Sequence, residues 1–109
     1  MLREPTYYIL ASLLDGPLHG YAVIKRTEEL SEGRVRLTAG TLYGALDRLA
    51  VEGLIASSGE ETVNGRARRY YRITPAGSTA LMEEAAAHAS AAAAVNSRLG
   101  SAAGVVHPA

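Results

Sequence analysis

Thr41, Gly44 and Arg48 place a hydroxyl, a position without a side chain and a guanidinium on one face of a predicted helix. The segment TAGTLYGAL within it holds two glycines, and each interior glycine costs about 1 kcal/mol relative to alanine, so their presence needs a reason. A face of this kind can come close to a phosphate backbone or to base edges, from which bulky side chains would hold the helix away. The alternative is that Gly44 packs against the neighbouring hairpin.

A second candidate element is the basic heptapeptide RARRYYR, Arg66 to Arg72, which holds four of the eleven basic side chains. The net charge of the whole chain is zero, whereas residues 34–72 carry seven basic and four acidic side chains. A local basic element on a neutral protein is suited to a specific contact with phosphate. The alternative is a solvated strand edge, because arginine and lysine often protect exposed edges from pairing.

Three helices are predicted before this basic element. The spacing of apolar residues predicts helices over 6–14 and 21–30, and the alternating RVRL predicts a short strand over 34–37. Thr38 is a good N-cap for the third helix, whose leucine stripe is closed by Gly53 at a C-terminal position.

The next apolar pieces, 54–58 and 67–73, predict a β-hairpin with a long polar tip that turns at Asn64-Gly65. The predicted fold class is therefore mainly α with a small β-hairpin: a winged helix-turn-helix followed by a C-terminal dimerisation helix. In such a fold the third helix lies in the major groove of DNA. The alternative is a winged helix that serves only protein contacts and does not bind DNA.

The pair Thr74-Pro75 supplies an N-cap and a first helical residue, and predicts a fourth helix. We expect a DNA-binding domain over 1–74, a dimerisation helix over 75–99 and a flexible tail over 100–109. Apolar and small residues recur along this helix at alternating spacings of four and three, which is a heptad seam suited to a homodimer. The candidate dimer residues are Leu81, Ala85, His88, Ala92, Val95 and Leu99.

Enzymatic and metal-binding functions find little support in the sequence. The three histidines are far apart, and no phosphate loop or dinucleotide fingerprint is present. Glu84 and His88 have the spacing of two metal ligands on one helix but lack a third, so we interpret them as an exposed helix pair. We therefore expect no catalytic residue, metal or cofactor. Without cysteines, a signal peptide or a stretch apolar enough for a bilayer, the expected location is the cytoplasm, away from membranes.

Three linked segments resemble the PadR family of bacterial transcriptional regulators. YYILASLLDGPLHGYAVIKRTEEL is similar to the first two helices of the family, AGTLYGALDRLAVEGLI to its recognition helix, and RRYYRITPAG to its second wing strand and exit. The resemblance covers residues 6 to about 99. It implies a homodimer, bound to an inverted-repeat operator, that acts as a repressor relieved by a small-molecule effector at the dimer interface.

The resemblance also implies roles for particular residues. The Tyr43 hydroxyl is expected on a phosphate with its ring against the second helix, and the wing arginines on the DNA backbone or in the minor groove. His19 is expected to serve the junction before the second helix. Together with the helix face described above, the candidate DNA-binding residues are Thr38, Gly40, Thr41, Tyr43, Gly44, Arg48, Arg66, Arg68 and Arg69.

The seam departs from the family at one position. Family members commonly have a large aromatic residue, often tryptophan, near the position of His88, where it helps to line a drug pocket between subunits. Here the residues that face the first helix are small or polar, so stacking on a planar ligand is missing. We expect either a small polar effector bound through His88 or release from DNA without a planar drug.

Overall fold

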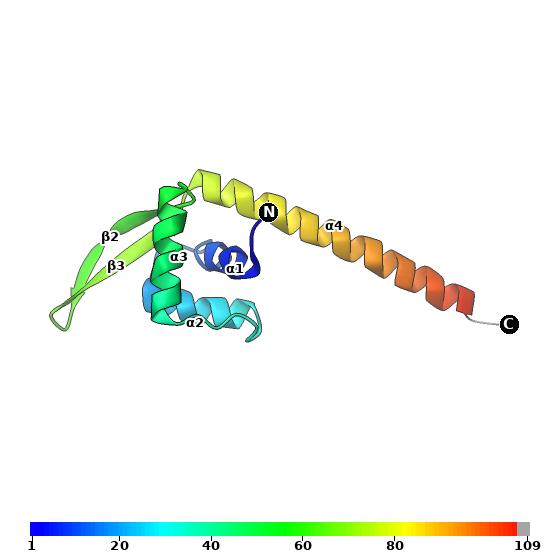
Figure 1. Ribbon diagram of the computed structural model, residues 1–109, viewed down its shortest axis with the longest axis horizontal. Coiled ribbons are helices and arrows are strands. Elements are labelled where there is room, and N and C mark those ends of the chain that lie inside the picture. The colour runs from blue at the N-terminus through cyan, green and yellow to red at the C-terminus, as the bar shows by residue number, and fades with distance from the viewer. Residues whose placement is uncertain (107–109) are drawn as a thin grey trace.

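The computed structural model describes residues 1–106, which form four helices and one three-stranded antiparallel sheet (Figure 1). The predicted fold class, a mainly helical winged helix-turn-helix with a long last helix, is confirmed. The elements in chain order are α1 (Glu4–Ser12), β1 (Leu18–His19), α2 (Gly20–Leu30), α3 (Ala39–Val51), β2 (Ile55–Val63), β3 (Arg66–Ile73) and α4 (Pro75–Val106).

The core lies where α1, α2 and α3 meet, because each helix has one apolar stripe that must leave water. Eight apolar side chains of the core are at most 2% exposed. They are Ile9, Leu10 and Leu13 from α1 and its end, Val23 from α2, Leu42, Leu46 and Leu49 from α3, and Ile55 from the first residue of β2. The predicted leucine stripe of α3 is therefore buried, and the orientation of this helix is fixed.

The sheet differs from the prediction in two ways. The wing strands β2 and β3 extend up to a two-residue turn, Asn64-Gly65, so the tip is short and the polar residues expected there belong to β2. Both turn residues have positive φ, 52° and 76°, as the right-handed twist of a two-residue hairpin requires. In addition, β1 pairs with the other side of β3, through Leu18 opposite Tyr71 and His19 opposite Tyr70, so the strand order is β1-β3-β2.

The strand predicted over residues 34–37 is wrong. This segment connects α2 to α3 without regular structure. Its backbone is held instead by Ser31, whose hydroxyl accepts the Val35 N–H at 2.9 Å, and the Val35 side chain is buried. Alternation alone does not make a strand, because the backbone must also find a neighbouring strand to pair with.

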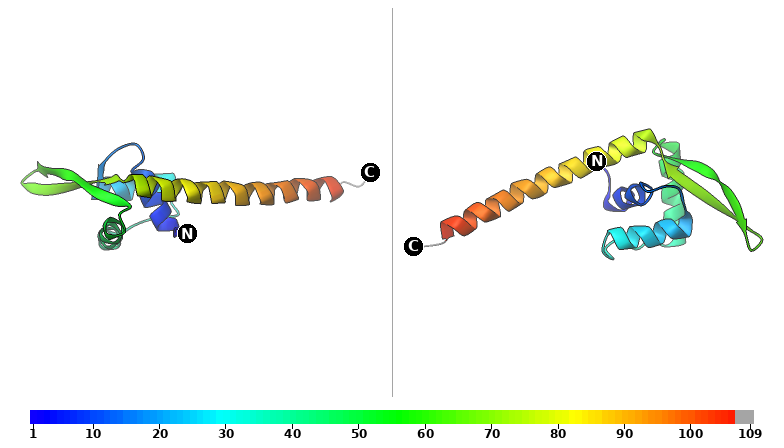
Figure 2. Two further views of the ribbon diagram at one scale, coloured as in Figure 1. Left: turned by 90° about the horizontal axis from the view of Figure 1, so that it is seen from above. Right: turned by 180° about the vertical axis from the view of Figure 1, so that it is seen from behind.

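The helix α4 is longer than predicted and leaves the head of the molecule (Figures 1 and 2). It continues through Gly100 to Val106, beyond the end predicted at residue 99, and residues 107–109 of the predicted tail lie outside the described part of the chain. Gly100 and Gly104 each cost the helix only about 1 kcal/mol, and the alanines of this helix favour it. The molecule measures 72 × 25 × 21 Å, with the wing and the far end of α4 pointing in opposite directions.

The start of α4 is fixed to the end of α3 by Thr74 and Gly77. The Thr74 hydroxyl accepts the Gly77 N–H at 3.1 Å, which confirms the predicted N-cap, and donates to the Gly53 carbonyl at 2.6 Å. The Thr74 N–H donates to the Leu54 carbonyl at 3.0 Å. A side chain at Gly77 would overlap that same carbonyl oxygen, so this close approach requires glycine.

We expect Gly77→Ala to destabilise the fold by about 2 kcal/mol, because the added methyl group overlaps the Leu54 backbone and cannot move aside. The melting temperature should fall by roughly 10 °C. Gly44→Ala is the matched control. It adds the same group to a helix where no other atom lies within 4 Å, and should stabilise the fold by up to about 1 kcal/mol. Equal melting temperatures for the two variants would refute the close contact at Gly77.

Candidate nucleic-acid interface

The N-terminus of α3 is capped by Thr38, as predicted. Its hydroxyl oxygen accepts the Thr41 N–H at 3.2 Å and donates its proton to the Thr41 hydroxyl oxygen at 3.0 Å. The Thr41 hydroxyl oxygen thus accepts a hydrogen bond from Thr38, and its own O–H group is available to donate to an acceptor outside the protein. Thr38 acts on the helix, whereas Thr41 presents a donor at the surface.

The glycine face of α3 is open. A side-chain carbon added at Gly40 or Gly44 would meet no atom of another element within 4 Å. The alternative that Gly44 packs against the wing is therefore wrong, and the face has no partner among residues 1–106. Thr41 and Arg48 on the same face are also exposed. The result is a flat, accessible helix surface opposite the buried leucine stripe.

Tyr43 stands beside this face and covers the first residue of α2. A methyl group at Gly20 would lie 2.7 Å from the Tyr43 hydroxyl oxygen, so the ring can take this position only because Gly20 has no side chain. The ring is nevertheless 49% exposed. The predicted contact of the ring with the second helix is present, and its hydroxyl lies at the surface.

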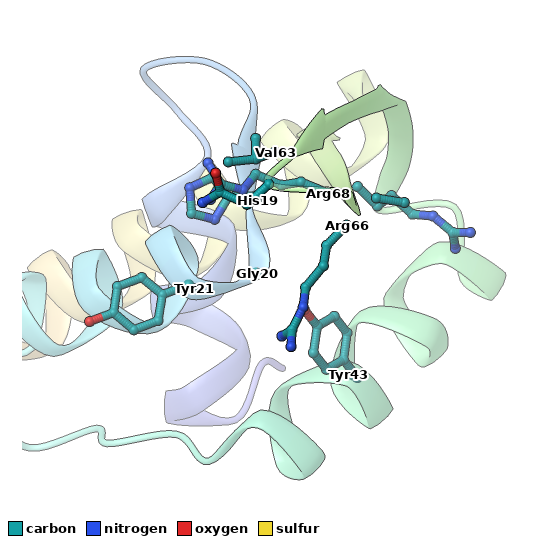
Figure 3. Close-up of a pocket in the computed structure, with 10 residues that line it drawn as sticks. His19, Gly20, Tyr21, Tyr43, Val63, Arg66 and Arg68 are labelled. Atoms are coloured by element: carbon teal, nitrogen blue, oxygen red, sulfur yellow. The ribbon is translucent and has the colours of Figure 1, made fainter.

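A groove of about 620 Å³ separates Tyr43 and the start of α2 from the wing (Figure 3). The wing contributes Arg66, Arg68 and Arg69, and Figure 3 shows the Arg66 side chain extending toward Tyr43. Four of the predicted residues are thus brought together at one groove, namely Tyr43, Arg66, Arg68 and Arg69. The remaining five, Thr38, Gly40, Thr41, Gly44 and Arg48, lie on α3 outside the lining of this groove.

The arginines are not electrostatically equivalent. Arg69 lies opposite Glu60 across the wing and pairs with it at 3.5 Å, and Arg48 pairs with Glu52 at 3.8 Å. No ion pair of the described residues involves Arg66 or Arg68. Because side chains alternate along a strand, Arg66 and Arg68 share one face of β3 and Arg69 takes the other. The first two are therefore the guanidiniums available to an anion.

His19 belongs to this groove, although the sequence suggested only a junction role. Its Nδ1 accepts the Ala22 N–H at 3.3 Å and so caps α2, which agrees with the predicted structural role. The ring meets Tyr70 edge-on with centroids 5.6 Å apart. Burial, and next the positive charge of Arg68, lower the pKa of His19 below its ordinary value of 6.5, whereas Glu61 raises it. The neutral ring is the form present at neutral pH.

The predicted dimer residues divide into two groups along α4. Leu81 is 4% exposed and belongs to the core, and Ala85 is half-buried. The others, Ala92, Val95 and Leu99, lie on the part of α4 that leaves the head, where Val95 is 56% and Leu99 62% exposed. The far half of the seam is therefore an uncovered apolar surface.

His88 lies at the division between these groups. Its ring is 4.7 Å from that of Tyr7 on α1, and its Nε2 is 3.2 Å from Glu84. The Glu84 carboxylate also accepts the Leu2 N–H at 3.1 Å, and its side chain is only 13% exposed. The interpretation of Glu84 and His88 as an exposed pair is therefore wrong for Glu84, because this carboxylate joins the start of the chain to α4. Within the described residues no three histidine, cysteine or acidic side chains are grouped for a metal ion.

Residues 9–83 match the Transcriptional regulator PadR-like family. The Transcriptional regulator Rv3488 of Mycobacterium tuberculosis is 46% identical over 77 residues, which are 71% of this chain and 68% of that protein. The chain belongs to the PadR-like family of transcriptional regulators. The matched segment contains every predicted DNA-binding residue but only Leu81 of the predicted dimer residues.

Solved structures show the same fold. The PadR-like transcription factor of Bacteroides fragilis is 31% identical, with a TM-score of 0.69 over 84% of this chain and 85% of that one. The PadR of Bacillus subtilis, solved in complex with operator DNA, is 24% identical, with a TM-score of 0.66 over 74% of this chain and 46% of that one. None of the helices within residues 1–106 is both long and apolar enough to cross a membrane.

Proposed function

We propose that this PadR-like regulator is a homodimeric, sequence-specific DNA-binding repressor that a small-molecule effector releases from an inverted-repeat operator. The observation that carries the proposal is the open glycine face of α3 beside two unpaired wing arginines. A helix face free of side-chain bulk can enter a major groove, while guanidiniums on the wing hold flanking phosphates. The fold shared with the B. subtilis PadR, solved with operator DNA, is compatible with this use.

The competing function is a winged-helix module that contacts only other proteins. Such a module has no need for Arg66 and Arg68 to line an open groove without forming an ion pair with any described residue. Titration of mixed-sequence and upstream-region duplexes at two salt concentrations separates the two functions. DNA binding that weakens steeply with salt supports the repressor, and absence of salt-dependent binding supports the protein-only module.

The proposed effector is small and polar. Along α4 the neighbours of His88 at helical spacing are alanines apart from Glu84, with which His88 pairs, and the His88 ring lies against Tyr7 of α1 at a tilted angle. A polar group can hydrogen-bond to this imidazole, whereas a planar drug finds no large ring on α4. A fluorescence screen of planar cationic dyes tests this choice. Tight binding of one planar dye per dimer, with the same affinity in His88→Ala, would contradict the proposal of a small polar effector.

For the wing, we expect Arg68→Ala to weaken binding to all duplexes alike and to reduce the slope of log K against log salt by about 0.9, the share of one phosphate contact. The matched variant is Arg69→Ala. It should reduce the slope by much less, because Glu60 already compensates the Arg69 charge. Equal reductions in the two variants would refute the different roles of the two arginines, and an unchanged slope in both would refute the wing as a phosphate contact.

For the dimer, we expect Ala92→Glu to lower the mass measured by light scattering toward that of the monomer. A two-fold interface brings the same patch of both subunits together, so the substitution places like charges near the axis. Ala94→Glu, on the opposite side of α4, is the control and should leave the dimer intact. A fully dimeric Ala92→Glu protein would show that this seam is not the interface.

A further inference from the structure

The groove between α2 and the wing is lined by groups that donate hydrogen bonds. His19, Tyr43, Arg66 and Arg68 bring an imidazole, a phenol and two guanidiniums to it. The lining contains no carboxylate, although Glu60 and Glu61 lie on the adjoining strand β2. An anion with several acceptor oxygens, such as a phosphate, matches this set of donors.

The His19 ring is fixed in one tautomer. Since Nδ1 accepts the Ala22 N–H, the proton of the neutral ring is on Nε2. The edge contact with Tyr70 sets the orientation of the ring. Among residues 1–100, whose side chains the structure describes, none accepts a hydrogen bond from Nε2, so this donor is available to a ligand.

The surroundings of His19 favour the uncharged ring. Arg68 faces it from β3 with a positive charge, and Glu61 from β2 with a negative one. Tyr70 from β3 meets the edge of the ring, and Tyr43 from α3 lines the same groove. Protonation at Nδ1 would also break the cap of α2, because that nitrogen could no longer accept the Ala22 N–H.

We propose that this groove holds a phosphate of the DNA backbone and that His19 donates a hydrogen bond to it from Nε2 as a neutral ring. The proposal rests on the DNA-binding function proposed above. Arg66 and Arg68 attract the phosphate by their positive charge, whereas the neutral His19 ring donates a directional hydrogen bond to it. A neutral donor adds affinity but neutralises no phosphate, so it contributes nothing to the salt slope.

Two substitutions separate the nitrogens of His19. His19→Asn keeps an acceptor that caps α2 but has no donor at the position of Nε2. His19→Gln places an amide nitrogen near the position of Nε2 but gives up the cap. The probe is a mixed-sequence duplex about three helical turns long, because phosphate contacts do not depend on sequence.

We expect His19→Asn to lower the affinity about tenfold at every salt concentration with an unchanged slope and an unchanged melting temperature. His19→Gln should retain most of the affinity but melt at a lower temperature. Wild-type affinity should be constant between about pH 7 and about pH 8.5, because the neutral ring takes up no proton on binding. Inorganic phosphate at matched ionic strength should not displace the duplex.

Several results would overturn this inference. In His19→Asn, these are an affinity equal to that of the wild type and a salt slope reduced by about 0.9. In the wild-type protein, they are a DNA affinity that rises as the pH falls from about 8.5 to about 7 and displacement of the duplex by inorganic phosphate. A wild-type protein that shows no salt-dependent binding to any duplex would contradict the proposed function itself. The two failures are therefore distinguishable.

Discussion

Burial of the α3 leucine stripe is the constraint on which the rest of the structure depends. Leu42, Leu46 and Leu49 are at most 1% exposed, and burying each contributes about 1.5 to 3 kcal/mol. A helix has one orientation that hides these three side chains, so Thr41 and Gly44 must face outward. The surface proposed to meet DNA is thus set by the core behind it.

A second consequence concerns the groove beside α3. With α3 fixed, Tyr43 has to lie over the start of α2, and this is possible only because Gly20 leaves space there. The pairing of β1 with β3 then brings His19 next to Tyr70 and into the groove that the wing arginines line. One arrangement of the backbone therefore positions an open helix face, two unpaired guanidiniums and a fixed imidazole on neighbouring elements.

The sequence predicted those parts of the fold that depend on local periodicity and on well-known caps. These are the four helices, the buried leucine stripe of α3, the N-caps Thr38 and Thr74, and the turn at Asn64-Gly65. It did not predict β1, because a strand of two residues has no periodicity and exists only through its pairing with β3. The burial of Glu84 depends on its contact with Leu2, a partner 82 residues away that no local pattern indicates.

For the candidate site too, local patterns in the sequence indicated some of the residues, whereas the contacts between distant segments could not be predicted. The open face of α3 follows from helical spacing, and the wing arginines from the concentration of charge. The different roles of Arg68 and Arg69 could not be foreseen, because the register places an acidic residue opposite each of them, Glu61 and Glu60, and only the Arg69–Glu60 pair is close enough to form an ion pair. The place of His19 in the groove also needed the sheet, since Tyr70 and Arg68 reach it from residues about fifty positions later in the chain.

The most direct test of the central claim is the DNA affinity of Gly44→Leu compared with that of Ala50→Leu. Both substitutions add the same side chain to an exposed position of α3, but only the first lies on the open face. We expect both proteins to fold and Gly44→Leu alone to lose DNA binding, by a factor of about 100 or more, because the leucine holds the helix away from the major groove. Equal affinities in the two proteins would contradict the claim that this face of α3 meets DNA.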